Sequence, residues 1–150
     1  MPTSLRSGFL KKTEKRYSLP TEAQWEYAAK GGNRSQGKTY AGSNSLGLVG
    51  WFFTNSGNQT HAVGQKQPNE LGIYDMSGNV LEWCHDWFAS NYYSQSPANN
   101  PVNQEVGDRL NRVLRGGSWV DDPFLCRSAH RGAHELNKCL DYVGFRLVSQ

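Results

Sequence analysis

The chain has 150 residues, of which 37% are hydrophobic and 12% aromatic, and its formal net charge is +3. This length suffices for one domain with its own hydrophobic core, and the aromatic content, which includes five tryptophans, excludes a disordered chain. No apolar run approaches the roughly 18 residues of a membrane helix, and residues 1–16 lack the apolar stretch of a secretory signal, so the sequence predicts no membrane insertion and leaves the location undetermined.

The first segment, residues 1–16, is basic and is predicted to be a flexible lead-in to a single domain over 17–150. Positive charge concentrates toward this end, because the first 40 residues carry eight lysines and arginines against three acidic residues. The cluster 11–16 suggests nucleic-acid binding, but only one aromatic residue, Tyr17, lies beside it. A solvated face is the simpler interpretation, so we expect no nucleic-acid partner.

Residues 22–30 are predicted to form an α-helix. Thr21 followed three residues later by Gln24 is the pattern of a capping box, which satisfies the first free N–H groups of a helix. An apolar stripe at helical spacing begins at Trp25, and Gly31 is a suitable residue to end the helix. This is the strongest local signal in the chain.

The remaining segments favour short strands separated by long irregular stretches. Residues 33–69 and 91–108 are rich in Gly, Asn and Ser and are expected to be loops. Strands are predicted at 71–74, 80–84, 112–115 and 143–148. The last of these is apolar and is expected to pair centrally in a sheet. No alternation of strands with helices is present, so the predicted class is α+β, with one or two helices, a small twisted sheet and much irregular chain.

Three cysteines, Cys84, Cys126 and Cys139, are an odd number and include no Cys-x-x-Cys pair. This count excludes a self-contained disulfide framework and argues against a zinc knuckle. One disulfide with one free thiol and three free thiols are both compatible with the sequence. The redox compartment therefore stays undetermined.

Four segments in this order and spacing resemble the formylglycine-generating enzyme (sulfatase-modifying factor) family. They read LPTEAQWEYAA at 19–29, NELGIYDMSGNVLEWC at 69–84, RVLRGGSW at 112–119 and GFRLV at 144–148. The resemblance covers about residues 17–148 and implies a loop-rich C-type-lectin-like fold. The usual N-terminal portion of the family is missing, so we expect either a compact member or a fragment.

The family implies an enzyme that oxidises a substrate cysteine to formylglycine with copper, held by a close pair of cysteines downstream of the GGSW-like segment. Two soft sulfur ligands are what Cu(I) requires. Cys126 matches one of them, but the next cysteine, Cys139, lies 13 residues further on, and none stands at the short spacing of the family. We therefore predict no catalytic residue and no required cofactor, and we keep the copper oxidase or a degenerate relative as the alternative.

The resemblance also implies a structural calcium site in the segment 75–82. Its ligands would be the side chains of Asp75 and Glu82 and the main-chain carbonyls of Gly78 and Val80. Mixed carboxylate and carbonyl oxygens suit Ca²⁺. The alternative is that the two carboxylates cap turns or pair with arginine.

The stretch between Trp119 and Gly144 departs most from an ordinary loop. Family members carry Asn-rich runs there, above all the variable proteins of diversity-generating retroelements, whose template adenines are mutagenised. Within 120–143 only Glu135 and Lys138 fall outside the residue types that randomising the first two bases of an Asn codon produces. Residues 126–129 and Arg131 keep the family pattern.

Apolar and aromatic residues mixed with charges in an exposed loop are typical of a binding surface. The predicted contact residues are Val120, Asp121, Asp122, Phe124, Leu125, His130, Gly132, Ala133, His134, Asn137, Leu140, Asp141 and Tyr142. We predict a non-catalytic protein that displays this hypervariable surface, 120–142, on a rigid scaffold. Its partner is expected to be a macromolecular ligand, namely another protein. The alternatives are that a few of these side chains complete the core, or that the chain is an accessory module of a larger protein.

Three further patterns are weaker. Residues 67–69, Gln-Pro-Asn, resemble the sugar-selecting tripeptide of calcium-dependent lectins, but they lie inside an ordinary segment of the family. A zinc site at His130, His134 and Cys139 would need a helix that the intervening glycine disfavours. The pair at 85–86, His-Asp, has no accompanying nucleophile and is interpreted as a buried, hydrogen-bonded polar pair.

Overall fold

The computed structural model describes residues 15–107 and 110–149, so most of the predicted lead-in, 1–16, lies outside the described residues. The helical elements are α2 (Glu22–Ala29), η1 (Gly32–Arg34), α3 (Leu46–Val49) and η2 (Tyr92–Ser94). The strands are β1 (Tyr17–Ser18), β2 (Leu81–Trp87), β3 (Asn111–Arg115), β4 (Arg131–Glu135), β5 (Val143–Gly144) and β6 (Val148–Ser149). The predicted α+β class is confirmed. None of the described helices is long and apolar enough to cross a membrane.

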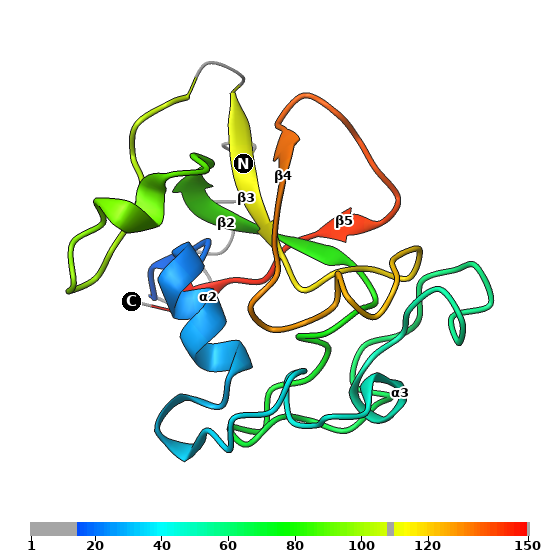
Figure 1. Cartoon of the computed structure of the whole chain (residues 1–150). Coiled ribbons are helices and arrows are strands. Elements are labelled where there is room, and N and C mark those ends of the chain that lie inside the picture. Colours follow the sequence, from blue (N-terminus) through cyan, green and yellow to red (C-terminus); the bar gives the residue numbers. More distant parts are fainter. Residues whose placement is uncertain (1–14, 108–109, 150) are drawn as a thin grey trace.

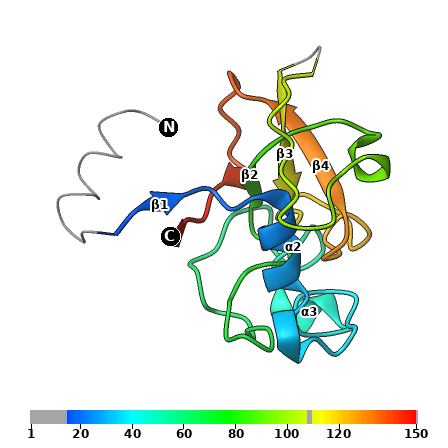
Figure 2. The same ribbon diagram turned by 90° about the vertical axis from the view of Figure 1, so that its left-hand side faces the viewer.

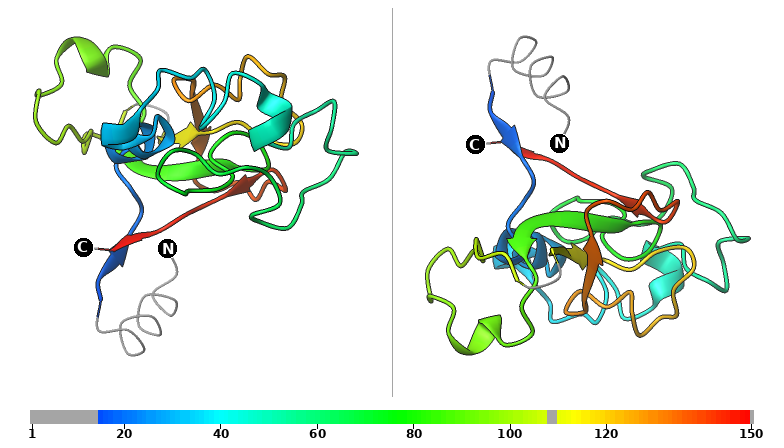
Figure 3. Two further views of the ribbon diagram at one scale, coloured as in Figure 1. Left: turned by 90° about the horizontal axis from the view of Figure 1, so that it is seen from below. Right: turned by 90° about the horizontal axis from the view of Figure 1, so that it is seen from above.

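The strands form two sheets. The larger has the order β4-β3-β2-β5, in which β3 pairs antiparallel with both β2 and β4, and β5 runs parallel to β2 (Figure 1). The smaller is a ribbon of β1 and β6 that stands off from the body of the molecule (Figure 3). The long connections between β2, β3 and β4 are largely loop. The sheet therefore acts as a small frame that carries much irregular chain.

Helix α2 forms where the sequence predicts it and packs on one face of the sheet. The capping box is present, because the Thr21 hydroxyl accepts the Gln24 N–H and the Gln24 side chain accepts the Thr21 N–H. Trp25 from the helix is buried against Cys84 of β2 and Val113 of β3. Burial of a large aromatic ring of this kind stabilises the fold by roughly 1.5–3 kcal/mol.

Residues 71–74 are not a strand, which corrects the sequence prediction. The buried side chain of Asn69 organises this segment as a turn: its Oδ1 accepts the N–H groups of Leu71 and Ile73, and its Nδ2 donates to the Ala28 carbonyl of α2 at 2.7 Å. The spacing of the apolar residues predicted a strand, because this spacing contains no sign of the hydrogen bonds that the Asn69 side chain makes to the main chain. Asn69 of the Gln-Pro-Asn segment therefore has a structural role, because its side chain holds the turn at 69–73 and joins it to α2.

The C-terminal segment 143–148 does not pair centrally as one strand, which is a second correction. It splits into β5, at the edge of the larger sheet, and β6, which pairs with β1. Between them Phe145 is exposed, and Arg146 turns inward to Glu82. The ladder between β5 and β2 ends at Gly144, and two residues later Arg146 pairs with Glu82 of β2 through its side chain.

Candidate ligand-binding face

The predicted variable segment, 120–142, consists of two loops joined by a strand. It follows the Gly116–Gly117 turn after β3, forms an irregular loop, then runs as β4 and returns through a second loop to β5. Strand β4 was not predicted, because Gly132 and Ala133 have low strand propensity and the pairing with β3 decides the conformation. Part of the expected loop is therefore rigid sheet.

The burial of this segment separates the two sets of residues only in part, because Ala129, which keeps the family pattern, is exposed. None of the thirteen predicted contact residues is buried, and Phe124 is 63% exposed. Between them, Cys126 and Ser128, which keep the family pattern, are buried at 0% and 1% exposure. The apolar residues Phe124, Leu125, Leu140 and Tyr142 lie outside the two buried core clusters. The segment thus alternates between side chains that the fold uses and side chains that it leaves accessible.

Phe124 is held in place at the surface by two neighbours. The Arg127 guanidinium lies 3.8 Å from the ring centroid, and the His130 ring meets it edge-on with centroids 6.1 Å apart. Arg127 Nε also donates to the Phe124 carbonyl at 2.9 Å. Partial burial, followed by the charge of Arg127, lowers the pKa of His130 from its ordinary value. The exposed ring is therefore preorganised rather than free to rotate away.

The start of the segment is tied to a neighbouring loop that sequence reasoning missed. The Asp121 carbonyl accepts the Phe53 N–H at 3.1 Å, and the Trp119 carbonyl accepts the Ser56 hydroxyl at 3.0 Å. Ser118 Oγ donates to the Asp121 carboxylate at 2.7 Å. Phe53, whose main chain makes one of these bonds, is an exposed apolar residue next to the start of the segment. Only the tertiary hydrogen bonds reveal this neighbour.

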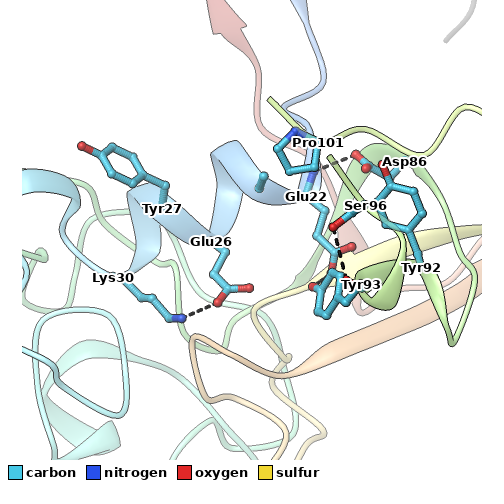
Figure 4. A pocket seen from close by; sticks show the side chains of 10 residues that line it. Glu22, Glu26, Tyr27, Lys30, Asp86, Tyr92, Tyr93, Ser96 and Pro101 are labelled. Atoms are coloured by element: carbon cyan, nitrogen blue, oxygen red, sulfur yellow. Dashed lines mark hydrogen bonds and ion pairs between the residues drawn. The ribbon is translucent and has the colours of Figure 1, made fainter. Parts of the chain in front are cut away.

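Strand β4 is anchored to α2 by a buried ion pair. Arg131 donates from Nε and Nη2 to the two carboxylate oxygens of Glu22, each at 2.7 Å, and its guanidinium lies over the rings of Phe88 and Tyr93. Arg115 of β3, fully buried, pairs with Glu26 one turn further along α2. Figure 4 shows Glu22 and Glu26 along α2, at a pocket that Tyr92, Tyr93 and Ser96 of the loop around η2 also line. This network fixes the base of the variable segment.

The three cysteines are free thiols, so the sequence alternative with one disulfide does not hold. Cys126 lies beneath Gly117, and burial, followed by the charge of Asp121, raises its pKa to about 12. Burial also raises the pKa of Cys84. Cys139 is exposed in the loop after β4. Cys126 is thus an enclosed side chain that packs against the Gly117 turn.

The residues proposed for calcium lie together before and within β2. Both carboxylate oxygens of Glu82 accept from Arg146, and Oε2 also accepts the Trp25 indole N–H, all at 2.6 Å. Asp75 Oδ2 accepts the Gly64 N–H at 2.7 Å, whereas its Oδ1 is buried and has no hydrogen-bond partner in the described part of the chain. A calcium ion would give this oxygen a partner but would share Glu82 with a guanidinium. The residues therefore fit the ion in part.

The weaker patterns gain no support as catalytic or metal sites. No group of three or more His, Cys, Asp or Glu side chains in 15–107 and 110–149 is placed to hold a metal, which includes His130, His134 and Cys139. Asp86 is buried and accepts the N–H groups of Glu22 and Asn103, as expected of a satisfied polar group. Its neighbour His85 is exposed, so the predicted buried pair is half correct.

The comparisons with known proteins identify the family. The model of the sulfatase-modifying factor enzyme 1-like domain matches residues 6–150, and the chain belongs to this family. It is 38% identical to the chaperone protein LppX of Paenibacillus barcinonensis over 88% of its length and 49% of that protein. It is 37% identical to the formylglycine-generating enzyme of Streptomyces coelicolor over 87% of its length and 46% of that enzyme. The chain thus spans about half the length of these relatives.

A solved structure is similar in fold and in sequence. The structure of Treponema denticola variable protein 1 superposes with a TM-score of 0.78 and 39% identity, over 89% of this chain and 47% of that one. The expected fold of the formylglycine-generating-enzyme type is confirmed by this similarity and by the family match. The family thus includes formylglycine-generating enzymes, and one structural neighbour is a variable protein.

Proposed function

We propose that the protein is a non-catalytic binding protein that presents an exchangeable face, residues 120–142 with Phe53, to a macromolecular ligand. The observation that carries the proposal is the division of burial in this segment. Every predicted contact residue is at least partly accessible, while Cys126, Ser128 and the Arg131 ion pair hold the backbone. Substitution of the accessible positions would change the chemistry of the surface and leave the frame intact.

The similarity to a variable protein supports this proposal and suggests where the diversity arises. In the proposed account, a diversity-generating retroelement rewrites the codons of the contact residues. A protein is the favoured ligand, because an exposed mixture of apolar, aromatic and charged groups suits a protein surface better than a small-molecule cleft. Preorganisation of Phe124 by Arg127 and His130 reduces the ordering cost of binding, roughly 0.5–1.5 kcal/mol for each flexible side chain.

Deep sequencing of the 3′ end of the gene across a growing population tests the proposal. Substitutions are expected to concentrate in the codons of the thirteen contact residues, with the codons of 126–129 and Arg131 unchanged. The first half of the gene serves as the internal control for sequencing error. A uniform sequence in 120–142 would contradict diversification in that population.

Phe124→Ala and Tyr142→Ala are expected to leave folding nearly intact while removing ligand binding. Phe124 is 63% exposed and Tyr142 is only partly buried, so truncation opens no enclosed cavity. Thermal unfolding followed by circular dichroism checks the first half of this prediction without any ligand. A large fall in the unfolding midpoint of either variant would assign its side chain to the core instead.

The alternative function is copper-dependent formylglycine generation, and the observation in its favour is the similarity to the Streptomyces coelicolor enzyme. Against it stands the lack of a second cysteine at the family spacing, because the next cysteine, Cys139, lies 13 residues beyond Cys126. A peptide-oxidation assay with Cu(I) and oxygen distinguishes the two functions. We expect no turnover; turnover that Cys126→Ser abolishes would favour the oxidase.

Calcium is proposed as a structural ligand rather than a catalytic one. We expect saturating Ca²⁺ to raise the thermal unfolding midpoint of the calcium-stripped protein, because an ion bound only by the folded state stabilises it. Asp75→Asn should remove this effect, since the unpaired Oδ1 is what the ion would satisfy. Mg²⁺ is the matched control for ionic strength. An equal midpoint with and without Ca²⁺ would contradict the calcium site, and Glu82 would then have only its protein partners, Arg146 and Trp25.

A further inference from the structure

Among the strands of the described residues, none lies beside the outer edge of β4. Strand β4 is the terminal strand of the larger sheet, and Figure 2 shows it as the outermost of β2, β3 and β4. Its five residues, Arg131–Glu135, pair with β3 over their whole length. Within the described residues, the main chain of this strand makes no hydrogen bond to any other segment. Half of its N–H and C=O groups therefore face outward.

Little on β4 would block a partner strand. Proteins protect open edges with charged side chains, prolines, bulges or covering loops. Here the centre of the strand carries the small residues Gly132 and Ala133, and the β3–β4 register is regular. The two charged residues stand at the ends of the strand: Arg131 turns its side chain inward to Glu22, and Glu135 pairs with Lys138. The edge is short but open.

We infer that β4 receives an extended segment of the ligand, which adds to the sheet as a further strand. The inference rests on the proposed function, because β4 lies inside the proposed face and directly follows His130. The occupant is a polypeptide in extended conformation, since only a main chain offers donors and acceptors at the spacing of the strand. Folded proteins would take part through an edge strand or an extended loop.

Main-chain pairing answers a difficulty that an exchangeable face raises. Each substitution removes side-chain contacts to the previous ligand. If binding depended on side chains alone, every new variant would lose the affinity of its predecessor. The outward C=O groups of β4 persist whatever residues occupy 132–134, and the outward N–H groups persist unless a proline is introduced. They supply sequence-independent affinity, and the side chains supply selectivity on both faces of the added strand. Ala133, which lies opposite Val113, would contact the added strand on the face of the sheet that α2 covers. His134, which lies opposite Arg112, would contact it on the other face.

A phage-displayed library of random linear peptides, panned on the full chain, provides the probe. A synthetic copy of a selected peptide is then bound, and amide hydrogen exchange is followed with and without it. In the free protein the outward amides of Arg131–Glu135 should exchange faster than the inward ones, which β3 protects. The peptide is expected to slow the outward amides of β4.

Gly132→Pro and Ala133→Pro form a matched pair of variants. Neighbouring N–H groups of a strand point to opposite edges, so one proline removes an outward donor and the other breaks the ladder with β3. The variant that keeps the wild-type circular dichroism spectrum identifies the outward position. In that variant the dissociation constant of the peptide should rise at least about tenfold, because a donor is lost and a ring obstructs the edge.

Unchanged peptide affinity in the folded proline variant would overturn the inference, as would protection confined to residues outside 131–135. Failure to select any peptide would also overturn it, since main-chain pairing tolerates many sequences. None of these results affects the sequencing test of the proposed function. Peptide binding that depends on Phe124 but not on the β4 edge would leave the exchangeable face standing and exclude strand addition.

Discussion

Glu22→Ala is expected to lower the free energy of unfolding by about 3–5 kcal/mol, which is the cost of removing one partner from a buried ion pair. Glu22 is 3% exposed and accepts both Nε and Nη2 of Arg131, while Arg115 Nε lies 3.7 Å away. The truncation leaves the Arg131 guanidinium without its carboxylate, while Arg115 keeps its ion pair with Glu26. Arg131 would then cease to hold β4 against α2.

Urea unfolding monitored by tryptophan fluorescence measures this effect. Glu105→Ala is the matched control, because Glu105 is exposed and its side chain makes none of the ion pairs found in the described residues. The control should change stability by less than about 0.5 kcal/mol. A loss below about 1 kcal/mol in Glu22→Ala would show that Arg131 is not the anchor of the face.

Gly117→Ala is expected to destabilise the fold by about 3 kcal/mol, from backbone strain and overpacking together. The residue has a φ of +71°, and an added Cβ would lie 2.6 Å from Cys126 Sγ and 2.8 Å from Cys126 Cα. The sulfur can turn aside, but the Cα belongs to the backbone, so the loop after β3 must move. Displacement of this loop carries Phe124 with it.

Gly37→Ala separates the two contributions to that loss. Gly37 has a similar φ of +66°, but nothing lies within 4 Å of the position of an added Cβ. Its substitution should therefore cost only the backbone strain, about 1 kcal/mol. Chemical denaturation of both variants checks the difference. Equal losses at the two positions would mean that the contact between Gly117 and Cys126 is not tight.

The helix and the fold class could be predicted from local sequence signals, whereas the bounds and pairing of several strands could not. The capping box at Thr21 predicted α2 to within a residue, because the side-chain bonds that start a helix are local. The misassigned strand 71–74 and the divided segment 143–148 depend on Asn69 and Arg146, whose partners lie 41 and 64 residues away in sequence. Strand β4 depends on its neighbour β3 rather than on its own composition.

The candidate face was predicted from contrast along the sequence. Mixed residue types around 126–129 and Arg131, which keep the family pattern, indicated which side chains the fold would leave accessible. Cys126 and Ser128 are buried in agreement with this contrast, whereas Ala129 is exposed. Phe53 and the Glu22 anchor were missed, because each joins the face through a contact distant in sequence. Periodicity and motif spacing carry no record of such contacts.

The most direct test of a fixed frame with an exchangeable face is the stability of every single-substitution variant in 117–143. Stability is measured as resistance to protease of the chain displayed on a cell surface. We expect the thirteen contact positions to accept most residue types. Substitutions at Gly117, Cys126, Ser128 and Arg131 are expected to unfold the protein. Tolerance at these four positions, or intolerance across the thirteen, would contradict a fixed frame that carries an exchangeable face.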